Sequence, residues 1–461
     1  MVKLIYLFIF LTNFINYKND LLEEDQIFLK FPFNTKIRSH PEGTLNDKYN
    51  ETDFINDYLN NPIFMNISIG TPKQQIKVKL DQNENCFTFI RDKKIMEYND
   101  KYLNNSNYTK VTLYNKNDSS TSRNGSATKY DKNNEYNILY DIEDVFYLNE
   151  YSDINNISIK NESTYLIFLY ENNYGDEEIV YGNIGIDMNN YKDIICPRFG
   201  YSLKNNNLIK KYIYYFDFYS FFHGYFYIGA EPHIFNIKYN NYKEYQYLKL
   251  NTLVSKDGFV NWSLSFNKII LKNKTNDYNH NLREKMVQFD FNSELFIGTT
   301  EFQDYIENNF FNELINLKIC DKTLVNYSYN NTITKYYVYK CNRTFMNGEN
   351  FDKDKFRPYN NYFGLFPDFQ LFHVNLEHNF YISNYDLFKL IHDNYYFLMI
   401  FEAEKVNKIW KFGQLFLRIH QLIFDYDSKI IGYYDRRIEP PKNDSDKKKS
   451  DDNEEQNNYD D

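Results

Sequence analysis

Two short stretches far apart in the chain share one layout, and this repeat constrains the fold more than any other feature of the sequence. Residues 79–87 have the sequence KLDQNENCF and residues 288–296 have QFDFNSELF. In each, a strand-like pattern ends at an aspartate, asparagine is the second residue after it, and an apolar run follows. With 461 residues the chain has room for two or three domains. Internal duplication is the simplest explanation of the repeat.

Between 62 and 434 the chain mostly consists of short runs in which apolar and polar residues alternate, bounded by Asn, Asp, Gly or Lys, as is typical of strands. These runs lie at 64–69, 76–80, 86–90, 136–140, 165–169, 225–229, 245–250, 262–271, 287–289 and 295–298. The 46 Tyr and 41 Phe favour strands, because stiff aromatic side chains suit a pleated surface. Helical spacing is found at 301–317. We therefore expect an all-β fold with a few short helices.

The N-terminus indicates entry into the secretory pathway. Lys3 precedes a mainly apolar run at 4–15, which is short for a membrane span and typical of a signal peptide. We assign 1–17 to a signal peptide, with an uncleaved anchor as the alternative, and 18–60 to a leader or pro-segment. No later run is long and apolar enough to span a membrane, so we expect a luminal or extracellular protein with no membrane span after the signal.

Charge and residue spacing bear on partners and cofactors. The net charge of −10 argues against a nucleic-acid surface, which needs concentrated basic residues to displace counterions from phosphates. Residues 440–461 are mainly acids, lysines and other polar residues, and we expect a disordered acidic tail.

The spacing of the His and Cys residues fits no metal motif, so neither a metal ion nor another cofactor is expected.

The chain contains four cysteines, an even count that suits an oxidising compartment. Cys320 and Cys341 are close enough in sequence to close a loop of about twenty residues, worth about 3 kcal/mol by chain entropy, and we predict a disulfide between them. Cys86 and Cys196 are either a second pair or free buried thiols.

Several motifs, in order, resemble the pepsin family of aspartic proteases over 62–434. NISIGTPKQQIKVKLD at 66–81 is similar to the family's strand, Ile-Gly-Thr-Pro turn and second strand, which leads into the first catalytic aspartate. WKFGQLFLRIHQLIF at 410–424 and DYDSKIIGY at 425–433 resemble its C-terminal Gly-Asp-x-Phe-x-Arg strand and last hairpin. Further segments match in the expected order at 182–186, 225–231, 258–271 and 365–372. The resemblance implies a bilobal, pepsin-like double β-barrel, with lobes at 61–235 and 236–439 and a long cleft between them.

The same resemblance assigns catalytic roles to Asp81 and Asp290, which end the strand-like parts of the two repeated stretches. Facing each other at the base of the cleft, their carboxyl groups would share one proton and hold a water molecule, since two like charges so close do not both ionise. One carboxylate would then take a proton from the water while the other carboxyl group protonates the scissile carbonyl oxygen.

The residues that support these aspartates in the family are mostly replaced. Family members have Thr-Gly-Ser or Thr-Gly-Thr after each aspartate, whereas this chain has QNE at 82–84 and FNS at 291–293. Gln82 can supply the cross-lobe hydrogen bond of the lost threonine, but the Phe291 side chain has neither donor nor acceptor. The two asparagines take up space where glycines let the backbones approach closely.

The resemblance also implies which residues contact a peptide in the cleft, namely Tyr140, Asn83, Asn292 and Ser293. Tyr140 falls in NILYDIED at 137–144, which is similar to the hairpin that closes over substrate in the family. Ser293 is the one hydroxyl partner retained. The Gly-Asp-x-Phe-x-Arg motif loses its aspartate, which is replaced by Gln414.

Two hypotheses follow. The first is a catalytically impaired homologue, a pseudoprotease, which as a monomer binds a peptide or a protein in the interlobe cleft. The second is an active aspartic endopeptidase that hydrolyses peptide bonds through Asp81, Asp290 and an activated water, with the side-chain amides of Asn83 and Asn292 in place of backbone amides. The replaced residues favour the first, because a catalytic pair needs its surroundings to fix its geometry.

Overall fold

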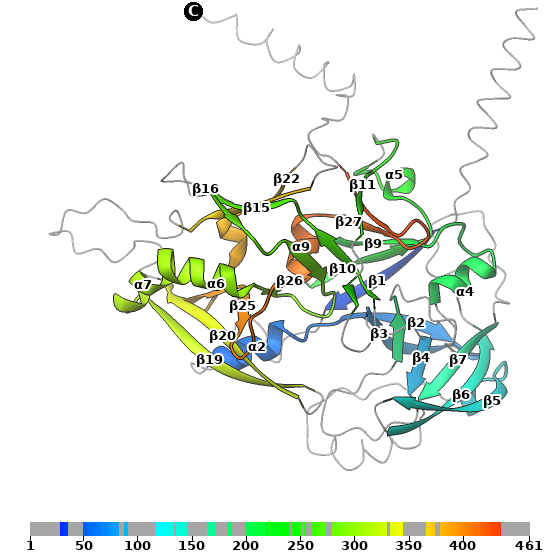
Figure 1. Ribbon diagram of the computed structural model, residues 1–461. Helices are drawn as coiled ribbons and strands as arrows, with labels where there is room; N and C mark the ends of the chain where they lie inside the picture. Colours follow the sequence, from blue (N-terminus) through cyan, green and yellow to red (C-terminus); the bar gives the residue numbers. More distant parts are fainter. Residues whose placement is uncertain are drawn as a thin grey trace, which may run out of the picture.

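The computed structural model describes most of the region in which strands are expected (Figure 1). The described residues are 28–35, 49–82, 87–90, 116–132, 135–145, 147, 164–170, 182–186, 199–220, 222–239, 242–250, 253–254, 260–272, 279–329, 332–343, 366–373 and 379–434.

β-Strands dominate this structure, and the expected all-β class is confirmed. The largest sheet has thirteen strands, in the order β11 (Gln246–Lys249), β28 (Ile430–Tyr433), β27 (Leu422–Asp425), β9 (Ile213–Phe218), β10 (His223–Ile228), β1 (Leu29–Thr35), β2 (Ile63–Ile69), β3 (Gln74–Asp81), β8 (Gly182–Gly185), β4 (Phe87–Ile90), β7 (Thr164–Tyr170), β6 (Glu135–Val145) and β5 (Arg123–Lys132).

Three further sheets complete the described β structure. The nine-stranded sheet has the order β14 (Ser263–Ser265), β17 (Met286–Phe289), β26 (Ile409–Phe412), β18 (Phe296–Ile297), β25 (Met399–Glu402), β20 (Thr332–Asn342), β24 (Asn394–Phe397) and β23 (Phe388–Ile391), with β19 (Cys320–Tyr329) paired to β20. The four-stranded sheet has the order β16 (Asn279–Leu282), β15 (Lys268–Lys272), β21 (Asp368–Phe372) and β22 (Asn379–Ile382). The two-stranded sheet pairs β12 (Leu253–Val254) with β13 (Val260–Asn261).

The helices in the described ranges are short. They are α2 (Glu51–Tyr58), α4 (Phe199–Asn205), α5 (Pro232–Phe235), α6 (Thr300–Ile306), α7 (Asn312–Asn316) and α9 (Gln414–Ile419), with the 3-10 turns η1 (Lys116–Asp118) and η5 (Asn384–Leu387) and the π-helical turn η3 (Glu307–Phe311). The elements α6, η3 and α7 follow one another without a break, which confirms the helix predicted at 301–317. None of the helices in the described ranges has the length and apolar character that a membrane crossing needs.

One order of strand pairings occurs twice. In what we call the first repeat, β3 is antiparallel to β2 and parallel to β8, β4 is antiparallel to β8 and parallel to β7, and the β5–β6 hairpin extends the sheet from β7. The second repeat has the same pairings. β17 is antiparallel to β14 and parallel to β26, and β18 is antiparallel to β26 and parallel to β25. The β19–β20 hairpin extends the sheet from β25. This pattern agrees with internal duplication of the chain.

The middle of the largest sheet has the same symmetry (Figure 1). The hairpins β9–β10 and β27–β28 meet through β9 and β27, and β1 and β11 flank them on opposite sides. Tyr214 of β9 stacks on Phe424 of β27 with ring centroids 5.3 Å apart. In β1, every second residue is buried, namely Leu29, Phe31 and Phe33, as the period of two in a strand requires. Aromatic packing thus joins the two hairpins at the centre of the sheet.

Two elements lie in the region 18–60 that the sequence assigns to a leader or pro-segment. Strand β1 is enclosed between β10 and β2. Helix α2 begins with a capping box, in which Asn50 and Asp53 exchange side-chain-to-backbone hydrogen bonds. Its residues Phe54, Ile55 and Tyr58 are fully buried. Both elements are integral parts of the described fold.

Two local expectations are wrong. Residues 414–419, in the motif that resembles a strand, form helix α9, and residues 137–144, expected to form a whole hairpin, lie in β6, which is only the second arm of the β5–β6 hairpin. Strand β6 remains extended because it pairs with β5 over 135–143 and with β7 over 139–145. Helix α9 follows Gly413, where an added Cβ would lie 2.4 Å from the carbonyl oxygens of Ser293 and Leu295. This close approach requires glycine, and the chain turns there from β26 into the helix.

Candidate functional site

Asp81 and Asp290 occupy equivalent places in the two repeats. Asp81 is the last residue of β3, and Asp290 directly follows β17. The carbonyl oxygen of Asp81 accepts a hydrogen bond from the Ile186 N–H at 3.0 Å, and the Asp290 N–H donates to the Phe412 carbonyl at 2.9 Å. Each aspartate is therefore held where its strand leaves a parallel pairing, with β8 in the first repeat and with β26 in the second.

Two amide side chains connect the loops that carry the aspartates. Gln82 Nε2 donates to Asp290 Oδ1 at 3.3 Å, and Gln82 Oε1 accepts from the Phe291 N–H at 3.0 Å. In the opposite direction, Asn292 Nδ2 donates to Asp81 Oδ1 at 3.3 Å. The Asn292 N–H also donates to Asp290 Oδ1 at 3.0 Å. Each loop thus donates a hydrogen bond to the carboxyl group of the other, and the structure brings Asp81 and Asp290 together.

Phe291 packs where the family resemblance leads one to expect a hydrogen-bonding threonine. Its side chain is fully buried, with ring centroids 5.3 Å from Phe216 and 5.0 Å from Phe424. The cross-loop hydrogen bond comes instead from Gln82, as expected, because the glutamine accepts from the Phe291 backbone. The second loop is therefore held through its backbone and through aromatic packing.

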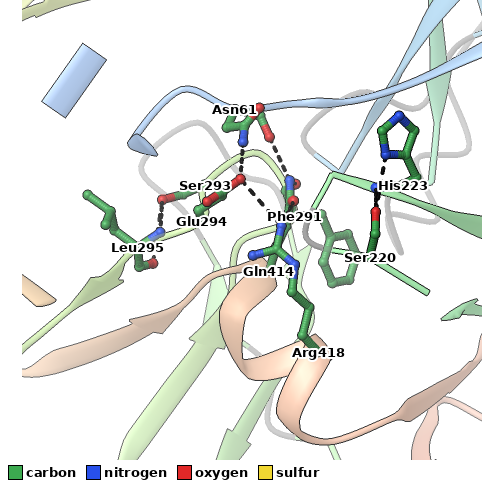
Figure 2. Close-up of polar contacts among 9 residues, drawn as sticks. All are labelled: Asn61, Ser220, His223, Phe291, Ser293, Glu294, Leu295, Gln414 and Arg418. Atoms are coloured by element: carbon green, nitrogen blue, oxygen red, sulfur yellow. Dashed lines mark hydrogen bonds and ion pairs between the residues drawn. The ribbon is translucent and has the colours of Figure 1, made fainter. Parts of the chain in front are cut away.

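Ser293 makes its hydrogen bonds within its own turn (Figure 2). Its Oγ accepts from the Leu295 N–H at 3.0 Å and donates to the Leu295 carbonyl at 3.4 Å, and the residue is 1% exposed. The structure therefore does not join the Ser293 hydroxyl to the two carboxyl groups. Its predicted contact with a peptide stays a prediction.

A lysine contacts Asp81. Lys79 Nζ lies 2.9 Å from Asp81 Oδ2, and the two side chains are only 9% and 10% exposed. Residues two apart in a strand point to the same face, so the spacing within β3 places Lys79 beside Asp81. The family motifs do not point to Lys79, but the strand period does, because residues 79 and 81 are two apart and therefore lie on one face. With so little solvent around it, the ion pair is weakly screened.

The surroundings of Asp290 favour its protonated form. Burial raises the pKa of Asp290 above its ordinary value, and the negative charge of Asp81 adds to this effect. Lys411, the Asn292 N–H and Lys79 act in the opposite direction, and Lys411 is the strongest of these three. Asp290 therefore keeps its proton to a higher pH than a solvated aspartate does.

Two further side chains, from distant strands, lie near enough to Asp290 to interact with it electrostatically, and the family motifs indicate neither of them. Lys411 lies on β26, in parallel register with Gln288, which is two residues before Asp290. Tyr336 comes from the β19–β20 hairpin, and its pKa is raised by burial and then by the carboxylates of Glu402 and Asp290. Their positions near Asp290 depend on sheet pairing, which no local pattern in the sequence indicates.

A buried polar network lies behind the loop that follows β17 (Figure 2). Arg418 Nη2 donates to Glu294 Oε1 and to Gln414 Oε1, both at 3.3 Å, and Asn61 Nδ2 also donates to Glu294 Oε1. Gln414 Nε2 donates to the carbonyl oxygens of Asn61 at 2.6 Å and Phe291 at 2.8 Å. Gln414, which replaces the family's aspartate, thus joins that loop at Phe291 to the segment after α2 at Asn61.

Of the other predicted binding residues, Tyr140 lies in the middle of β6, where its register partners are Ala127 of β5 and Leu169 of β7. Asn83 lies outside the described residues. In the described part of the chain, no group of three or more His, Cys, Asp or Glu is arranged to hold a metal ion. The carboxyl pair and its amide neighbours therefore form the candidate site.

The disulfide predicted between Cys320 and Cys341 is confirmed. The two cysteines are register partners in the β19–β20 hairpin, and their sulfur atoms are 2.01 Å apart. Cys86 and Cys196 lie outside the described residues.

No protein-family model and no curated protein matches this chain. Its function is therefore inferred from the geometry and the charges of the site.

Proposed function

We propose that this protein is a pepsin-like aspartic endopeptidase homologue of the secretory pathway that is catalytically impaired and binds a peptide or another protein. In this proposal the lobes are 61–235 and 236–439, and the ligand occupies the cleft between them. The repeated strand pairings support the bilobal fold, because two equivalent β units each present one aspartate at the same place. The amide contacts between the loops support a common site for Asp81 and Asp290.

The contacts of Asp81 are the main support for impaired catalysis. Its Oδ1 accepts from Asn292, and its Oδ2 lies against the ammonium group of Lys79. A general base must lie within hydrogen-bond reach of the proton that it removes and must have a lone pair for it. Because the Lys79 cation contacts the carboxylate and favours its ionised form, Asp81 is a weakened base toward a water molecule.

Binding without hydrolysis is compatible with the same geometry. A protonated carboxyl group can donate a hydrogen bond to a peptide carbonyl, and burial favours the protonated form of Asp290. This supports a role in which Asp290 contacts a peptide backbone while Asp81 stays paired with Lys79.

The alternative is an active aspartic endopeptidase, and one observation favours it. Asp81 lies beside a cation whereas the pKa of Asp290 is raised, so the pair can hold one ionised and one protonated carboxyl group at mildly acidic pH. Peptide hydrolysis by two aspartates starts from such a state, with the ionised group as base and the protonated group as acid.

A peptide-library assay separates the two. The full chain, produced through a secretory pathway, is incubated with mixed peptides from about pH 3.5 to 7, with and without a statine-type transition-state mimic. We expect the mimic or individual peptides to bind and no peptide to be cleaved. The variants Asp81→Asn and Asp290→Asn are assayed in parallel.

Each other outcome has a distinct meaning. Cleavage that the mimic blocks and that both substitutions abolish would establish the active enzyme. Cleavage that survives both substitutions would come from a contaminating protease and would support neither function. A protein that neither binds nor cleaves any peptide or mimic would contradict the proposed function.

A further inference from the structure

The two repeats differ in where each places a lysine relative to its aspartate. In the first repeat, Lys79 stands two residues before Asp81 and contacts its Oδ2 at 2.9 Å. In the second repeat the lysine stands on the neighbouring strand instead: Gln288, two residues before Asp290, is neutral, and its register partner on β26 is Lys411. The register partner of Lys79 on β8 is Asn183, also neutral. Among the described residues, the lysine that forms an ion pair at this site therefore contacts Asp81 and not Asp290.

The hydrogen bonds of the two carboxyl groups have the same asymmetry. Asp290 Oδ1 accepts from two neutral amides, the Gln82 side chain and the Asn292 backbone. Asp81 accepts from one neutral amide and from the Lys79 ammonium group. An opposite charge in contact favours the ionised form of a carboxyl group, whereas burial favours the neutral form.

The other described groups that interact with Asp290 do not remove this difference. Lys411 of β26 and Lys79 of β3 both lower the pKa of Asp290, yet burial outweighs them and the net shift is upward. Tyr336 of β20 faces Asp290 with its own pKa raised, so the tyrosine adds no negative charge there. The pair thus has one carboxyl group with a cation in contact and one that favours its proton.

We infer that Lys79 is a built-in counter-ion, which keeps Asp81 ionised and prevents the two carboxyl groups from sharing a proton. Sharing needs two sites of nearly equal proton affinity, and a buried cation against one of them removes that equality. Proton uptake by the pair then occurs at Asp290 alone. This inference rests on the proposed function, for which it identifies Lys79 as an autoinhibitory contact that holds the base inactive.

Carboxyl-carbon NMR titration of the full chain tests the inference directly, and it does not depend on any ligand. In the wild-type protein we expect Asp290 to titrate while Asp81 stays ionised over the same pH range. In Lys79→Met we expect Asp81 to take up its proton at higher pH, coupled to Asp290, because the contacting cation is gone. The control is Lys77→Met, which removes an exposed lysine from the same face of β3 and should leave both titrations unchanged.

A second variant keeps the test valid if Lys79→Met does not fold. In Lys79→Met/Asp81→Asn the buried ion pair is replaced by neutral groups, a change that proteins often tolerate. If Asp81 is ionised, its charge and that of Lys79 nearly cancel in their effect on Asp290. Asp290 should then titrate at nearly the same pH in this variant as in the wild-type protein. If Asp81 shares a proton with Asp290, removal of the second carboxyl group moves the Asp290 titration to lower pH, and the inference is wrong.

Binding of a statine-type mimic separates this inference from the proposed function. We expect Lys79→Met to bind the mimic at least about tenfold more tightly than the wild-type protein and Lys77→Met, because the freed pair can share a proton across the mimic's hydroxyl group. Equal binding by all three proteins would overturn the inference and leave the proposed function intact. If none of them binds a mimic or a peptide, the proposed function fails, while the NMR titration still decides the role of Lys79.

Discussion

Gln82 uses both ends of its amide group to join the two loops. Its Oε1 accepts from the Phe291 N–H, and its Nε2 donates to Asp290 Oδ1. An amide carries a donor and an acceptor at fixed positions, so one side chain can serve both partners. Gln82 is 4% exposed, and water has little access to replace these bonds. Loss of the amide would leave a buried N–H group without its acceptor.

We predict that Gln82→Leu lowers the free energy of unfolding by about 1–3 kcal/mol, because a buried donor left unpaired loses its hydration without compensation. Urea denaturation measures the change. The matched control is Gln75→Leu, an exposed glutamine on β3, the strand that Gln82 directly follows, for which the change should stay within about 0.5 kcal/mol. Equal effects of the two substitutions would show that Gln82 does not support the second loop.

At the scale of elements, helix α2 connects the N-terminal region to the second repeat. The ring of Phe54 stacks on Tyr396 of β24 with centroids 4.7 Å apart, and Glu51 forms an ion pair with Lys340 of β20 at 2.6 Å. Just after the helix, the Asn61 N–H donates to the Asn292 carbonyl at 2.8 Å. The helix therefore helps to hold the loop of the second aspartate. Removal of this helix with a pro-segment would expose the surface that it covers.

We predict that Phe54→Ala destabilises the folded protein by about 3–5 kcal/mol, because a fully buried aromatic side chain leaves a cavity that the sheet behind it cannot close. Asn56→Ala, on the exposed face of the same helix, is the control and should change stability little. Thermal or urea unfolding measures both variants. A mature protein that begins after residue 60 and is as stable as the longer chain would contradict the structural role of α2.

At the scale of the whole molecule, the candidate site exists because the two repeats meet. Gln82 and Asp290 are 208 residues apart in sequence, and their contact forms only when both loops are in place. The same meeting removes water from Asp290 and raises its pKa. Unfolding separates the repeats and returns this carboxyl group to water. The pKa of Asp290 is therefore higher in the folded state, where the two repeats meet, than in the unfolded state.

This link predicts a pH dependence of stability. The pKa of Asp290 is raised in the folded state, so its proton stabilises the fold below the unfolded-state pKa, and this contribution is lost as pH rises through the folded-state pKa. In that window the free energy of unfolding of the wild-type protein should fall with rising pH relative to Asp290→Asn, which lacks this proton. The exposed Asp304→Asn is the control and should follow the wild-type curve. Parallel curves for wild type and Asp290→Asn would contradict the prediction.

Periodicity in the sequence determined most of the elements. Alternating runs became β2, β3, β10 and β17, and the helical spacing at 301–317 became α6, η3 and α7, because the side-chain period of a strand or helix is a local property of the chain. The disulfide between Cys320 and Cys341 was predictable for a similar reason, since their small separation suits one hairpin. The layout shared by 79–87 and 288–296 likewise identified the two aspartates that the structure brings together.

Tertiary contacts decided the rest. The apolar residues of 414–419 suit a strand or a helix, and they form the helix α9 directly after Gly413 packs against the neighbouring loop. The buried partner of Arg418 is Glu294, which no local pattern indicates. The hydrogen bonds between the aspartate loops depend on β3 pairing with β8 and β17 pairing with β26. Such pairings join distant segments through backbone groups common to all residues, so local sequence alone does not specify which segments meet.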